Sequence, residues 1–229
     1  MEEFASDLMS QLESKVSFVI PIFGGIPIAT SVVITWGIML FLVILAKVMV
    51  RDLKMVPTGK QLYLEAAVGW INSFVADILG EEGRKYAPYL GTVAIYIGIS
   101  NVMGVLGITP PTKDLNVTAG LAIMSIILIE YSGIRKKGAK GWLKSFAEPM
   151  PLIAPINVLE IFIRPLSLCM RLFGNVLGAF VVMELIKLIA PAIIPVVFSL
   201  YFDIFDGLIQ TYVFVFLTLL FMKEKMEHE

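Results

Sequence analysis

Arg171 is a permanent positive charge in the middle of a long apolar stretch near the C-terminus. Arginine stays protonated at any ordinary pH, and a charge at the centre of a bilayer costs from about 3 to more than 10 kcal/mol. The ends of the stretch, near Pro155 and Pro191, lie roughly 25–30 Å away along a helix axis, so the side chain reaches an interface only if the helix tilts strongly. Such an arginine usually faces a partner or a water-filled path. The alternative is a structural arginine that is paired inside a helix bundle.

Small and polar residues share the helix face of Arg171. At about 100° per residue, this face carries Ser167, Gly174, Asn175 and Gly178. Small residues let another helix come close in a membrane. Ordinary helix packing would explain the stripe alone, but together with Arg171 it indicates a contact surface for a partner that carries an acid.

A second set of polar residues lies further along the chain. Asp203, Asp206 and Gln210 are spaced i, i+3, i+7, so they share one helix face. If the last two apolar segments run antiparallel, Glu184 lies at the depth of the two aspartates, which predicts an outer polar cluster. The alternative for each acid is a hydrogen-bonded side chain near a helix end, and Lys187 at i+3 offers such a partner to Glu184.

Glu160 precedes Arg171 on nearly the same helix face, toward the cytoplasm. With Asn157 and Glu148 it would form an inner polar cluster, and Arg171 and Gln210 would fall between the two clusters. Acidic hydrated pockets attract cations, and a fixed positive charge between them prevents a continuous cation path. An ion could then cross only on a moving carboxylate that is ionised opposite Arg171 and neutralised where it faces lipid.

The composition is that of a polytopic membrane protein. Of 229 residues, 58% are hydrophobic and 16% are charged, and the mean hydropathy is +0.86. The formal net charge of −1 predicts no nucleic-acid partner. The single Cys169, the single His228 and the lack of a G-x-x-x-x-G-K-[ST] loop lead us to expect no metal and no cofactor. The acidic N-terminus is unlike a cleavable signal peptide, so the first span should be retained.

Three full spans are predicted before the C-terminal stretch, at Ile26–Ala46, Tyr86–Ile108 and Val117–Ile134. Gln61–Leu79 is more polar and is predicted to be an interfacial or bundle-facing helix. Basic loops follow the first and third spans, and the positive-inside rule puts them in the cytoplasm and the N-terminus outside. They contain Lys47, Arg51, Lys54 and Lys60, and Arg135, Lys136, Lys137, Lys140 and Lys144.

The C-terminal stretch predicts a helical hairpin. Pro155–Ala190 would be roughly 50 Å long as one helix, so it must tilt, kink at Pro165 or run partly along the membrane. Pro191–Pro195 would make the reversal, and Val196–Met222 the return helix, which ends in the cytoplasm.

We therefore expect an all-α polytopic membrane protein of about five to six helices with a long tilted C-terminal hairpin. It would be one membrane domain, residues 1–229. Residues 1–25 would be an external lead, 26–148 peripheral helices and 149–229 the ion-translocating hairpin.

The run Arg164–Asn175, with the sequence RPLSLCMRLFGN, resembles the signature of subunit a of F-type ATP synthases. The segment Gln210–Phe214 resembles the family's last helix. Upstream matches extend the resemblance over most of the chain, at Asp114–Thr118, at Asn101, and at Glu65 with Trp70–Asn72.

The resemblance implies a non-catalytic membrane stator subunit beside a ring of c subunits. It implies two offset half-channels for H⁺ or Na⁺, with Arg171 facing the carboxylate of each passing c subunit. The implied partners are the c-ring, the b subunits of the peripheral stalk, the rest of the ATP synthase and membrane lipid. The implied location is a bacterial plasma membrane.

Individual residues take roles from this resemblance. Gln210 matches the glutamine that faces the family's arginine, and Asn175 matches the asparagine of the signature. Asp203 falls where many members carry Glu or His in the outer channel. Glu160 matches an acid near the start of the same helix in many bacterial members.

The chain also departs from the family pattern. Phe180 stands where many members carry Glu or His, and Gly104 stands where some carry Asp. Asp203, Asp206 and Glu184 would then share the outer path.

Two other functions stay open on the residues alone. A secondary transporter often shows internal repeats, and none is visible here. A structural scaffold would tolerate Arg171→Gln with full energy coupling.

Overall fold

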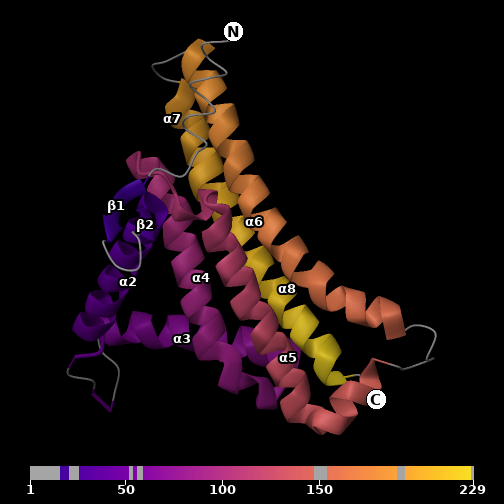
Figure 1. Cartoon of the computed structure of the whole chain (residues 1–229). Coiled ribbons are helices and arrows are strands. Elements are labelled where there is room, and N and C mark those ends of the chain that lie inside the picture. The colour runs from indigo at the N-terminus through magenta and orange to yellow at the C-terminus, as the bar shows by residue number, and fades with distance from the viewer. Residues whose placement is uncertain are drawn as a thin grey trace. The chain divides into compact units, whose positions relative to one another are not determined.

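The computed structural model describes residues 16–20, 26–51, 54–55, 59–146, 154–189 and 194–227. Within these ranges, six segments are long and apolar enough to cross a membrane. The predicted all-α polytopic membrane fold is therefore confirmed. The elements, labelled in Figure 1 where there is room, are the strands β1 (Val16–Ile20) and β2 (Ile26–Ala29); the helices α2 (Thr30–Met49), α3 (Lys60–Leu79), α4 (Ala87–Val102), α5 (Leu115–Ser145), α6 (Ala154–Ile189), α7 (Ile194–Ser199) and α8 (Gly207–Glu227); the 3₁₀ turns η1 (Glu81–Tyr86), η2 (Met103–Leu106) and η3 (Pro111–Lys113); and the π-helical segment η5 (Leu200–Asp206).

The first span begins later than predicted. Ile26–Ala29 is a strand that pairs antiparallel with β1, and the helix starts at Thr30. The strand segments are rich in β-branched residues, and an isolated two-stranded ribbon has only edge strands, which tolerate Pro27. The other residues of the predicted external lead, 1–15 and 21–25, lie outside the described ranges.

α3 was predicted to be too polar for a confident span. It is among the six candidate spans, with the lowest mean hydropathy of them, 1.3. α3 lies across the direction of α5 (Figure 1). By its length and composition, α3 therefore qualifies as a candidate span.

The basic cluster after the third span was predicted to lie in a loop. In the structure it lies on a helix. α5 continues to Ser145, so Arg135–Lys144 forms its C-terminal part. At Gly138 the backbone leaves the helical region, with φ 74° and ψ 162°, and the helix kinks there.

The C-terminal hairpin is built from two long segments, as predicted. α6 has 36 residues and continues through Pro165, which makes it roughly 54 Å long. The return segment, Ile194–Met226, combines α7, η5 and α8. The reversal was predicted at Pro191–Pro195; residues 190–193 are outside the described ranges, and Ile194 and Pro195 begin α7.

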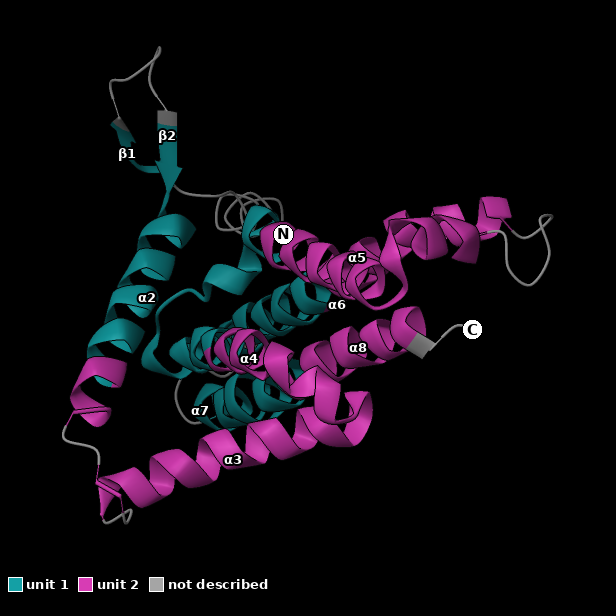
Figure 2. Cartoon of the chain, turned by 90° about the horizontal axis from the view of Figure 1, so that it is seen from below, with its two compact units in different colours: residues 1–45, 96–118, 172–211 teal, residues 46–95, 119–171, 212–229 magenta. Residues whose placement is uncertain are grey.

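The chain divides into two compact units, coloured in Figure 2. Unit 1 comprises residues 1–45, 96–118 and 172–211, and unit 2 comprises residues 46–95, 119–171 and 212–229. Several long helices, α6 among them, contribute one part to each unit.

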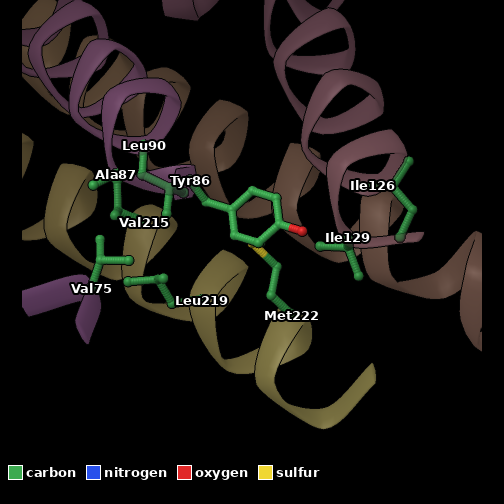
Figure 3. Close-up of a cluster of buried hydrophobic side chains, with 9 residues drawn as sticks. All are labelled: Val75, Tyr86, Ala87, Leu90, Ile126, Ile129, Val215, Leu219 and Met222. Carbon is green, nitrogen blue, oxygen red and sulfur yellow. The ribbon is translucent and has the colours of Figure 1, made fainter. Parts of the chain in front are cut away.

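Unit 2 contains an apolar core formed by α3, η1, α4, α5 and α8 (Figure 3). The contributions of α8 recur at i, i+4 and i+7, the spacing of one helix face. Lipid is as apolar as these side chains, so moving them out of lipid gains little free energy. Close packing between the helices therefore stabilises this core. The buried residues are Val75, Tyr86, Ala87, Leu90, Ile126, Ile129, Val215, Leu219 and Met222.

Candidate functional site

Unit 1 contains a cavity of about 340 Å³ between η2, the C-terminal half of α6, η5 and the start of α8. Its walls bring together five of the residues singled out from the sequence: Asn175, Glu184, Asp203, Asp206 and Gln210. The lining also includes Asn101, Gly104, Lys187 and Ser199. Carboxylates and amides thus meet in one cavity of a largely apolar hairpin.

Glu184 is held by Lys187 on the next turn of α6. The Lys187 Nζ lies 2.7 Å from the Glu184 Oε1, as the i+3 spacing had suggested. Lys187 offsets the charge of Glu184, so the acidity of the cavity comes from Asp203 and Asp206.

Asp203 accepts a hydrogen bond from Ser199. The Ser199 Oγ donates to the Asp203 Oδ2 over 2.7 Å, from one turn earlier. Both aspartates belong to the π-helical η5, a rare geometry that is frequent at functional sites. The sequence reasoning missed Ser199, although its i−4 spacing from Asp203 could have suggested the pair.

Asn175 and Gln210 join α6 to α8. The Asn175 Nδ2 donates to the Gln210 Oε1 over 3.2 Å. Gln210 is buried, and its Nε2 has no hydrogen-bond acceptor among the described residues. This amide can donate to a group that enters the cavity.

Phe180, a departure from the family pattern, also lines the cavity. The Lys113 Nζ lies 3.3 Å from the centroid of the Phe180 ring, within the range of a cation–π interaction. An aromatic ring at this position thus faces a cation from η3.

Arg171 lies on the open side of α6. Arg171 and the stripe residues Ser167, Gly174, Asn175 and Gly178 are all exposed, whereas the adjacent Leu168 and Leu172 are buried. Within the described part of the chain, Arg171 has no ion-pair partner. The alternative of an arginine paired inside its own bundle therefore finds no support in these residues.

Glu160 lies in unit 2 and is held by Arg164. The Arg164 Nη2 lies 2.5 Å from the Glu160 Oε2 and 2.5 Å from the Glu224 Oε1. The i+4 spacing of Glu160 and Arg164 was visible in the sequence, but the contact with Glu224 on α8 was not. Asn157 donates to the Phe146 carbonyl, and Glu148 lies outside the described residues.

The family model described as "ATP synthase A chain" matches residues 30–223. The chain belongs to the ATP synthase A chain family. The chain is therefore a multi-pass membrane component of an ATP synthase. Its family takes part in ion translocation.

Named relatives agree with this assignment. The "ATP synthase subunit a" of Moorella thermoacetica is 38% identical over 200 residues, covering 87% of this chain and 91% of the relative. The "ATP synthase subunit a, sodium ion specific" of Propionigenium modestum is 35% identical over 215 residues, covering 87% of this chain and 74% of the relative. The "ATP synthase subunit a" of Solidesulfovibrio magneticus is 35% identical over 212 residues, covering 90% of this chain and 88% of the relative.

Proposed function

We propose that the chain forms two offset ion half-channels against a ring of c subunits and couples ion flow to ring rotation and ATP synthesis. The observation that carries this proposal is Arg171, exposed and without an ion pair among the described residues, on a face of small side chains. Ser167, Gly174 and Gly178 leave room for a ring helix to approach this face closely. The chain itself is not catalytic.

Arg171 acts on the ring carboxylate that passes it. Its positive charge favours the ionised carboxylate at that point, whereas lipid favours the neutral one elsewhere. The same charge stops ions from leaking directly between the half-channels. Each elementary charge that crosses the membrane potential supplies about 2.3 kcal/mol per 100 mV.

The cavity of unit 1 is the outer half-channel in this proposal. Asp203 and Asp206 attract the cation, Glu184 contributes while paired with Lys187, and Asn175 and Gln210 connect the cavity to the arginine face. The carboxylates and amides that line this cavity, inside a largely apolar hairpin, support this role. Glu160 serves the inner half-channel, at the end of α6 that the positive-inside rule puts toward the cytoplasm.

The proposed setting is a bacterial plasma membrane, with the N-terminus outside and the C-terminus in the cytoplasm. The proposed partners are the c-ring, at the Arg171 face, and the b subunits of the peripheral stalk. The transported ion is H⁺ or Na⁺, and one relative bears the name "sodium ion specific".

The test is ATP-driven ion pumping by the whole complex in membrane vesicles. Arg171→Ala should abolish the uncoupler-sensitive pH or Na⁺ gradient while the complex still assembles. Arg135→Ala is the matched control, because Arg135 is an exposed arginine near the end of α5 and its hydrogen bond reaches only Tyr131 on its own helix. The ion that accumulates in the wild type identifies the substrate. Undiminished pumping by Arg171→Ala would refute the proposal.

A further inference from the structure

Within unit 1, α4 and η2 meet η5 and α8 at three contacts, each of which involves a glycine. Successive contacts are three residues apart along α4 and η2 and four residues apart along η5 and α8. The two pairs of elements run antiparallel. Small residues at such contacts let helix backbones approach closely in a membrane. The contacts are Gly98 with Thr211, Asn101 with Gly207, and Gly104 with Asp203.

The middle contact fixes the separation of the two elements. The buried Asn101 donates from Nδ2 to the Gly207 carbonyl over 3.1 Å and accepts at Oδ1 from the Thr112 Oγ1 over 2.9 Å. A Cβ on Gly207 would lie 2.8 Å from the Asn101 Cβ, closer than real side chains come. The backbone next to η5 therefore cannot move away from α4 without breaking this bond.

The contact of Gly104 with Asp203 lies in the cavity wall. A Cβ on Gly104 would lie 2.6 Å from the Asp203 Cγ and 3.0 Å from its Oδ2, and closer still to its Oδ1. The carboxylate therefore fills the space that a side chain at position 104 would need. Ser199 holds the other side of this carboxylate through its hydrogen bond.

We propose that Gly104 is a positioning residue that sets the place of the Asp203 carboxylate in the cavity. An aspartate at position 104 would carry its carboxylate into the same part of the cavity, so η2 or η5 can supply this group, but not both together. The inference rests on the proposed function, in which Asp203 attracts the cation of the outer half-channel. Because Gly104 has no side chain, the Asp203 carboxylate can occupy this place in the proposed ion path.

The first test compares two alanine variants in the ATP-driven pumping assay with the whole complex. Gly104→Ala should pump about tenfold more slowly or worse, since a displacement of about 1 Å in a site can cost up to 100-fold. Gly98→Ala is the matched control, because its Cβ would meet Thr211 at an ordinary 3.8 Å, and it should pump normally.

The second test exchanges Gly104 and Asp203. It does not require that the protein folds with alanine at position 104. Asp203→Gly should abolish pumping, and Gly104→Asp combined with Asp203→Gly should restore it, in complexes that assemble and hydrolyse ATP. A purely structural role for Gly104 would not give this rescue. A double variant no more active than Asp203→Gly, or a Gly104→Ala complex as fast as Gly98→Ala, would overturn the inference.

Arg171→Ala in the same assay separates the two proposals. If Arg171→Ala is inactive while Gly104→Ala matches its control, only the positioning role of Gly104 fails. If Arg171→Ala pumps normally, the proposed function itself fails.

Discussion

At the scale of single residues, two carboxylates in unit 2 share one buried guanidinium. Arg164 has only 7% of its side chain exposed, whereas Glu160 and Glu224 have 38% and 42% exposed. The ring of Phe221 lies 5.0 Å from the Arg164 Cζ and covers it further. Because the arginine is the charge that is costly to bury, the two ion pairs serve chiefly to make its burial tolerable.

Replacing Arg164 by methionine should therefore lower stability. We expect a loss of about 1–3 kcal/mol, less than the 3–5 kcal/mol usual for a broken buried pair, because both glutamates can regain water. The measurement is the temperature at which the detergent-solubilised complex loses this subunit. Arg135→Met, at an exposed position, is the control, and equal temperatures for the two variants would contradict the prediction.

At the scale of elements, Gly138 allows α5 to kink within the basic cluster. Its φ of 74° and ψ of 162° lie in a region that is essentially restricted to glycine. A side chain there would meet no other atom, so any cost of a substitution comes from the backbone alone.

Gly138→Ala should destabilise the protein by about 1–3 kcal/mol, the usual cost of such a backbone conformation. Gly120→Ala, at a helical position of α5 with equally open space, should instead stabilise it by about 0.5–1 kcal/mol. Thermal unfolding of the purified complex measures both effects. Stabilisation by both substitutions would show that the backbone at Gly138 is helical and that the kink is not retained in the membrane protein.

The long helices could be predicted from the sequence because about 20 apolar residues in a row leave little choice in a bilayer. β1, β2 and η5 could not. The strands are too short for periodicity to separate them from the start of α2, and a π-helical segment has no sequence pattern of its own. Asp203, Asp206 and Gln210 could be predicted to share one helix face because they are close in the chain, and all three line the cavity. Asn101, Gly104 and Glu224 depend on contacts across about 60 to 106 residues, and no local pattern reports such contacts.

At the scale of the whole molecule, the polar cavity residues and the apolar core belong to different units. Unit 1 holds the cavity with its carboxylates, and unit 2 holds the apolar core of Figure 3. Because α6 and α8 each contribute to both units, the sequence of one helix must satisfy a polar site over part of its length and close packing over the rest.

Two adjacent leucines of α8 test how that core is stabilised. Leu219 is fully buried in the core, whereas Leu220 is 43% exposed. In water, Leu→Ala in a core costs about 2–5 kcal/mol, of which part is the transfer of the side chain from water. In a bilayer the transfer part nearly vanishes, since lipid is as apolar as leucine, and only lost contacts and the cavity remain. We therefore expect Leu219→Ala to cost about 1–3 kcal/mol and Leu220→Ala close to nothing, measured as the thermal stability of the complex in lipid nanodiscs. Equal effects of the two substitutions would mean that the membrane, and not the packing of α3, α4, α5 and α8, holds this unit together.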